Sequence, residues 1–125
     1  MSSVLDVNAN DWEKEILKPD TLVVVDFWHK NCLWCLRLNP IYNEVSEEYK
    51  GRVIFAKLNV LESHDNQHIA IKYGIMSTPT LVFFCKGIPV ETVVGFQPKD
   101  RLKQLVDEMI EKHQECVEKS TALPQ

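Results

Sequence analysis

Four short apolar runs, separated by segments of helical periodicity, dominate the pattern along this chain. Three of them are apolar over the full length of a strand, which predicts strands buried on both faces. The fourth follows the turn at 86–89 directly, so it predicts a strand that returns antiparallel to the third. The predicted strands span residues 22–28, 53–60, 80–85 and 90–94.

Helices are predicted where apolar residues recur every three or four positions. Asn8 or Asn10 caps the first, which ends at Pro19. The second contains Pro40, where we expect a kink. The four predicted helices lie before residue 19, between Cys35 and Gly51, at 65–73, and from Pro98 onward. This order predicts an α/β fold with a mostly parallel sheet, helices on both faces and an antiparallel C-terminal hairpin.

The length of 125 residues fits one domain, which we place at 1–118, followed by a frayed polar tail at 119–125. The net charge of −4 does not favour binding to nucleic acid or to an anionic membrane, because both are negatively charged. No apolar stretch reaches the length of a membrane span, and no secretory signal is evident at the N-terminus. We therefore expect a cytoplasmic monomer that binds neither membranes nor nucleic acid.

Two cysteines, Cys32 and Cys35, lie two residues apart between the first strand and the helix that follows it. The free N–H groups and dipole of a helix N-terminus stabilise a thiolate, which is the nucleophilic form of cysteine. We expect Cys32 to attack and a buried Cys35 to resolve the mixed disulfide. The alternatives are two unreactive thiols or half of a zinc site. The second half of such a site is missing, because Cys85 is predicted as a core residue and Cys116 as an isolated free thiol.

Several polar residues near this motif could take part in its chemistry. Asp26 interrupts an apolar strand, so burial should raise its pKa and make it a proton acceptor, with Lys57 as its charge partner. His29 would lower the thiol pKa if protonated, or it is a plain exposed residue. His64 and His68 are four positions apart and could bind a metal, but two exposed residues on a surface helix are the better interpretation, so no metal site is predicted.

Together these residues resemble the thioredoxin family over about residues 4–112. The matching positions are Val25-Asp26-Phe27-Trp28, Cys32, Cys35, Pro40, Lys57-Leu58-Asn59, Lys72-Tyr73-Gly74-Ile75, Thr78-Pro79-Thr80-Leu81, Gly87 and Gly95. The resemblance implies the thioredoxin fold, a cis bond before Pro79, and dithiol–disulfide exchange with protein substrates. It departs from the family pattern at Leu33 and Trp34, where Gly-Pro is usual, and at Asn31, where Trp is usual.

The function that follows is a protein-disulfide oxidoreductase in which Cys32, Cys35, Asp26 and Lys57 carry the chemistry. The residues expected to shape the substrate groove are Trp28, Leu33, Trp34, Met76, Thr78, Pro79 and Gly95. No nucleotide or flavin fingerprint is present, so we expect no cofactor and a separate reductase as electron donor. The alternative is a non-enzymatic metal or iron–sulfur carrier, or a redox-regulated module that grips partners through Trp34.

The residues between the cysteines also bear on the redox potential. Trp34 has a backbone N–H where proline has none, and this donor should lie near the Cys32 sulfur. A donor that stabilises the thiolate stabilises the reduced form, so we expect a potential somewhat above the value of about −270 mV for thioredoxin.

Overall fold

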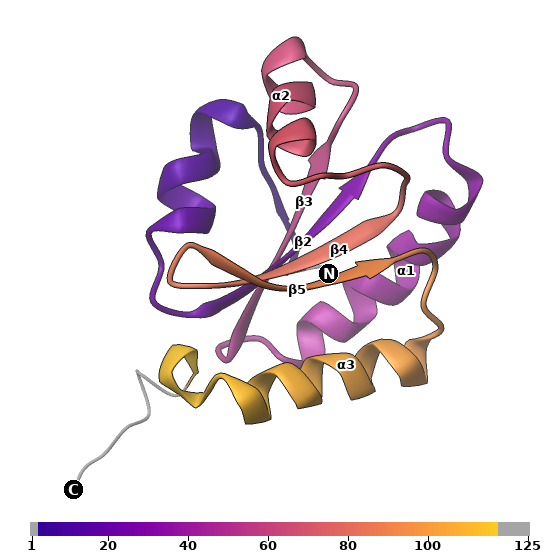
Figure 1. Cartoon of the computed structure of the whole chain (residues 1–125). Helices are drawn as coiled ribbons and strands as arrows, with labels where there is room; N and C mark the ends of the chain where they lie inside the picture. The colour runs from indigo at the N-terminus through magenta and orange to yellow at the C-terminus, as the bar shows by residue number, and fades with distance from the viewer. Residues whose placement is uncertain (1–2, 118–125) are drawn as a thin grey trace, which may run out of the picture.

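A five-stranded mixed sheet forms the centre of the computed structural model, which describes residues 3–117 (Figure 1). Its strand order is β1-β3-β2-β4-β5. Strand β2 runs parallel to β3 and antiparallel to β4, and the β4–β5 hairpin closes one edge. The strands are β1 (Leu5–Asp6), β2 (Leu22–Trp28), β3 (Val53–Asn59), β4 (Thr80–Cys85) and β5 (Ile88–Val94). The predicted α/β fold, with its central buried strand and its antiparallel hairpin, is confirmed.

Helices cover both faces of the sheet (Figure 1). One face carries α1 (Leu33–Glu48) and α3 (Lys99–Lys112), which is followed by the short η3 turn (Gln114–Cys116). The other face carries α2 (His64–Lys72) and the N-terminal turns η1 (Ala9–Asp11) and η2 (Glu13–Leu17). The part of the chain that the structure describes contains no helix long and apolar enough to cross a membrane.

The central strand β2 is buried on both faces because its apolar residues alternate between two separate cores. Val24 packs in the core under α1 and α3, whereas Val25 and Phe27 pack in the core under α2 and η2. The Tyr42 hydroxyl on α1 lies 2.7 Å from the Ala56 carbonyl oxygen and 3.0 Å from that of Val24. It thus ties α1 to β2 and β3.

The N-terminal region differs from the prediction. In place of a regular first helix, a 3-10 turn with Asn8 as its N-cap is followed by a π-helical turn that ends at Leu17. Strand β1 was not predicted, since its two residues are exposed and form no apolar run. Helix α3 begins at Lys99 with Pro98 as its N-cap, one position later than predicted. The predicted tail at 119–125 lies outside the described residues.

Candidate active site

The joint between β2 and α1 places Cys32 at the N-terminus of the helix. Cys32 is the N-cap of α1, and its sulfur accepts a 3.1 Å hydrogen bond from the Cys35 N–H. The two sulfurs form a disulfide, with the Cα atoms 5.2 Å apart. The donor to the sulfur is therefore the Cys35 N–H and not, as predicted, that of Trp34. The Cys35 N–H is present whichever residue occupies position 34, so the predicted rise in potential loses its basis.

The two cysteines differ in their access to solvent. Cys32 is partly exposed, whereas Cys35 is 1% exposed. The Thr78 carbonyl oxygen lies 3.5 Å from the Cys32 sulfur, close enough to accept a hydrogen bond from a reduced thiol. The peptide bond between Thr78 and Pro79 is cis, as the family resemblance implied. Of the two cysteines, Cys32 is therefore the one open to solvent, and the Thr78 backbone lies beside its sulfur.

Asp26 is buried in the middle of the sheet, with 2% of its surface exposed. It faces Lys57 in the parallel register of β2 and β3. Burial raises the pKa of its carboxyl group from 3.8 to about 7, and the positive charge of Lys57 opposes part of this rise. One carboxyl oxygen, Oδ1, has no hydrogen-bond partner within the described residues. Such a carboxyl group exchanges a proton near neutral pH, which suits it to general acid–base work.

Lys57 also contacts the tryptophan that ends β2. Its ammonium group lies 5.0 Å from the centre of the Trp28 ring. The Trp28 indole N–H is buried and, within residues 3–117, has no hydrogen-bond partner. Lys57 therefore contacts the ring of Trp28 and also faces Asp26 across the strand pair, where its charge favours the ionised carboxyl group.

Apolar side chains surround the exposed cysteine. Leu33 is 57% exposed, Trp34 50% and Met76 94%, which is unusual for side chains of this size. The Trp34 ring packs against Phe96, with ring centres 5.2 Å apart. The expectation that Trp34 remains available to a partner agrees with this exposure, although part of the ring rests on the domain.

A backbone hydrogen bond joins two other predicted groove residues. The Gly95 N–H donates to the Pro79 carbonyl oxygen at 2.8 Å, and Gly95 adopts a φ of 95°. A hollow next to Thr78 is lined by residues from four segments, among them His29, Leu61, Ile71 and Met76. The hollow and the exposed side chains of Leu33, Trp34 and Met76 together give this part of the molecule an open, partly apolar surface.

The three histidines considered above are half-buried at position 29 and exposed at positions 64 and 68. His29 Nδ1 accepts a 3.2 Å hydrogen bond from the Asn31 N–H, which fixes its ring beside the motif. His64 and His68 are exposed on α2, and neither belongs to a group of three possible metal ligands within the described residues. They fit the interpretation as surface residues.

The other two cysteines contradict the prediction for Cys116 and bear out the burial of Cys85. Cys85 and Cys116 form a second disulfide, with Cα atoms 5.8 Å apart, so Cys116 is not a free thiol. The burial predicted for Cys85 is confirmed, at 6% exposed. The η3 turn brings the chain after α3 back to the end of β4, and a contact across 31 residues leaves no local signal in the sequence. Cys85 and Cys116 are therefore paired with each other at the end of β4 away from Cys32, and they do not supply the second half of a zinc site for Cys32 and Cys35.

Comparisons with known proteins agree with this geometry. The Thioredoxin family model matches residues 3–108. The chain is 39% identical over 105 residues to a chloroplastic M-type thioredoxin of Brassica napus, covering 84% of this chain and 58% of that protein. It is 40% identical over 100 residues to a thioredoxin of Chlorobaculum thiosulfatiphilum, covering 80% of this chain and 90% of the relative. It is 36% identical over 107 residues to thioredoxin 1 of a Nostoc species, covering 86% and 97%.

Proposed function

The chain belongs to the thioredoxin family and is a thiol–disulfide oxidoreductase, and we propose that it reduces disulfides in proteins through Cys32 and Cys35. The observation that carries this proposal is the unequal exposure of the two sulfurs. Cys32 is partly exposed at the helix N-terminus, and Cys35 is buried next to it. A pair arranged in this way attacks with one thiol and completes the exchange with the other.

The first step is attack by the Cys32 thiolate on one sulfur of the substrate disulfide. A mixed disulfide forms, and the second substrate sulfur leaves as a thiolate that takes up a proton. The Cys35 N–H and the dipole of α1 both stabilise negative charge on Cys32. These interactions favour the thiolate near neutral pH, which is the form that reacts.

The second step releases the product. Asp26 takes the proton of the Cys35 thiol, and the resulting thiolate attacks the Cys32 sulfur, which expels the substrate sulfur. A general base works best when its pKa lies near the pH at which the protein operates. Burial raises the pKa of Asp26 to about 7, so it can accept and release a proton near neutral pH. Lys57 lies opposite Asp26 and stabilises its ionised form once the proton has left.

Substrate binding takes place on the apolar rim around Cys32. Leu33, Trp34 and Met76 offer exposed apolar surface, and the backbone at Thr78 and Pro79 lies beside the Cys32 sulfur. The remaining proposed contacts are Trp28 and Gly95. Polypeptides with exposed apolar side chains next to a disulfide are the substrate class that this surface suits.

The direct test is the reduction of insulin disulfides with dithiothreitol as the electron source. Cys32→Ser should abolish the catalysed rate, and Cys35→Ser should accumulate a mixed disulfide with the substrate. Cys85→Ser is the matched control, because it removes a cysteine at the other end of β4 and should keep the exchange activity. Full activity of the Cys32→Ser variant would refute the assignment.

Electrons are resupplied by a separate reductase in a reducing compartment such as the cytoplasm. In this setting the exchange runs toward substrate reduction because the dithiol is continually regenerated. The alternative function, a metal or iron–sulfur carrier that uses Cys32 and Cys35, requires stoichiometric bound metal and no exchange activity. Metal analysis of anaerobically purified protein, alongside the insulin assay, separates the two.

A further inference from the structure

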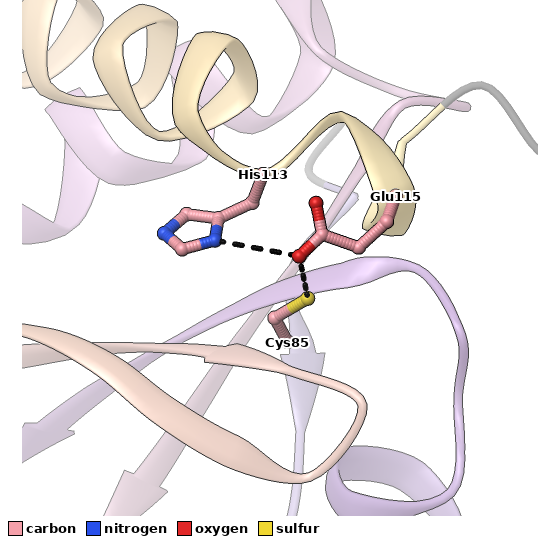
Figure 2. Close-up of side chains that lie close together, drawn as sticks. All are labelled: Cys85, His113 and Glu115. Carbon is pink, nitrogen blue, oxygen red and sulfur yellow. Dashed lines mark hydrogen bonds and ion pairs between the residues drawn. The ribbon is translucent and has the colours of Figure 1, made fainter.

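Three side chains with available electron pairs converge at the end of β4 that lies away from Cys32 (Figure 2). Cys85 is the last residue of the strand, and His113 and Glu115 lie where α3 passes into η3. Glu115 Oε2 is 3.7 Å from Cys85 Sγ and 3.9 Å from His113 Nδ1. Among residues 3–117, this is the group of three possible metal ligands that the fold brings within 4.8 Å of one another.

The spacing of these atoms is close to that around a tetrahedral zinc ion. Zinc bonds of about 2.0–2.3 Å at tetrahedral angles hold two ligand atoms about 3.3–3.8 Å apart. Of the two distances to Glu115 Oε2, 3.7 Å lies inside this range and 3.9 Å lies just above it. Thiolate sulfur, imidazole nitrogen and carboxylate oxygen are also the ligand types that zinc prefers. Only small side-chain movements would bring the three onto one ion.

Cys116 offers a fourth ligand, and its sulfur is bonded to that of Cys85. Cys116 Sγ forms the disulfide with Cys85 Sγ, and sulfur in a disulfide carries neither a proton to donate to Glu115 nor the negative charge that binds zinc. Reduction converts both sulfurs into thiols that can separate to the ligand spacing. We propose that reduction of the Cys85–Cys116 disulfide creates a zinc site with Cys85, Cys116, His113 and Glu115 as its four ligands.

The burial of the four side chains fits such a site. Cys116 is fully buried and Cys85 is 6% exposed, so the sulfurs would form the inner side of the site. The side chains of His113 and Glu115 are 20% and 57% exposed, so the ion enters from the surface that they cover. A structural zinc site closed by four protein ligands has this character.

The chemistry is balanced by a dithiol as reductant. The dithiol gives two electrons and two protons to the Cys85–Cys116 bond and becomes a disulfide itself, which leaves two protein thiols. Zinc then binds as the two thiols release their protons to solvent. A disulfide compound that takes two electrons from the two sulfurs, and becomes a dithiol itself, restores the Cys85–Cys116 bond. This removes two ligands and releases the ion, so the site holds either a sulfur–sulfur bond or a metal.

Zinc titration of the full chain, with Cys32 and Cys35 both replaced by Ser, tests the proposal. The protein is reduced with dithiothreitol, desalted without oxygen and titrated with zinc against a chromophoric chelator. We expect one zinc ion per reduced chain and none per oxidised chain. Cobalt in place of zinc should give thiolate-to-metal charge-transfer absorption and the visible bands of a tetrahedral site. Failure of the reduced chain to bind zinc would overturn the proposal.

Variants then identify the ligands. Cys116→Ser, His113→Gln and Glu115→Gln should each lower zinc affinity by at least the roughly 10–100-fold that follows the loss of an outer-shell partner. His68→Gln, which removes an exposed histidine from α2, is the matched control and should bind zinc normally. Equal zinc affinities of the His113→Gln and His68→Gln variants would also overturn the proposal.

A stability measurement covers the case in which Cys116→Ser does not fold. Zinc should raise the melting temperature of the reduced chain and leave that of the oxidised chain unchanged, because only the reduced chain has the site. His113→Gln and Glu115→Gln change partly exposed side chains and should fold, so they alone decide the question. If zinc raised the melting temperature of the reduced and oxidised chains equally, it would bind at another site, and the proposal would be overturned.

Discussion

Replacement of Asp26 by Asn should stabilise the protein at high pH and not at low pH. The carboxyl group is 2% exposed, and its pKa rises from 3.8 to about 7 in the folded chain because burial disfavours the charged form. Asn has almost the same shape and no charge at any pH. The Asn variant therefore removes the cost of burying the carboxylate and keeps the packing.

The sign and size follow from proton linkage. Between pH 3.8 and about 7 the folded chain holds a proton on Asp26 that the unfolded chain has lost, so stability falls as pH rises through this window. Each pKa unit corresponds to about 1.36 kcal/mol, so a rise of about three units costs the wild type about 4 kcal/mol above pH 7. Below the unfolded pKa the carboxyl group is protonated in both states and costs nothing.

Urea unfolding of the oxidised protein between about pH 4 and about pH 8.5 measures this cost. The stability of the Asn variant minus that of the wild type should grow by about 4 kcal/mol from the lowest to the highest pH. Asp20→Asn is the matched control, because Asp20 is exposed just before the same strand and solvent surrounds its charge. A difference for Asp26→Asn that stays constant with pH would show that Lys57 keeps the buried carboxylate ionised, and would remove Asp26 as the base for Cys35.

Three further changes test other parts of the structure. Cys116→Ala opens a disulfide that closes a 31-residue separation, and urea unfolding without reductant should show a loss of about 3–4 kcal/mol; an unchanged midpoint would mean that the bond does not form. Trp34→Ala removes half-exposed apolar surface beside Cys32, so KM for insulin should rise more than kcat falls, and an unchanged KM would exclude Trp34 from docking. Gly87→Ala should cost more than the roughly 1–2 kcal/mol of a left-handed residue, because the new Cβ would lie 2.8 Å from the Leu17 carbonyl oxygen. Gly51→Ala, at a similar φ and in open space, is its control, and equal thermal shifts for the two would contradict the close approach.

Local sequence patterns were sufficient to predict strand β2, the helix N-terminus that follows it and the buried carboxyl group of Asp26. The apolar run at β2 predicted a central strand, and the two cysteines after it predicted a helix N-terminus with one reachable sulfur. A single charged residue inside that run, Asp26, pointed to a buried titratable group. These predictions depend on residues within about ten positions of one another, so burial and helix geometry follow directly from sequence spacing.

Contacts between segments that are distant in the sequence could not be predicted from such local patterns. Strand β1 exists because Leu5 and Asp6 pair with Ala56 and Lys57 of β3, and two exposed residues carry no apolar signature of their own. The donor to the Cys32 sulfur was misassigned because the turn geometry at the N-cap, and not the residue type at position 34, decides which N–H points at it.

The Cys85–Cys116 disulfide shows most clearly what long-range structure adds. Strand β4 carries Thr80 at the end near Cys32 and Cys85 at the other, and its six residues span about 17 Å. The Cys32–Cys35 pair and the Cys85–Cys116 pair lie near opposite ends of this rigid strand. They cannot exchange within one molecule, because disulfide exchange requires direct contact between sulfurs. The Cys32–Cys35 dithiol of one molecule can therefore reduce Cys85–Cys116 only in another molecule. The state of the second disulfide then depends on the dithiol pool around the protein. Its two cysteines are 6% and 0% exposed, so that exchange is slower than attack at Cys32.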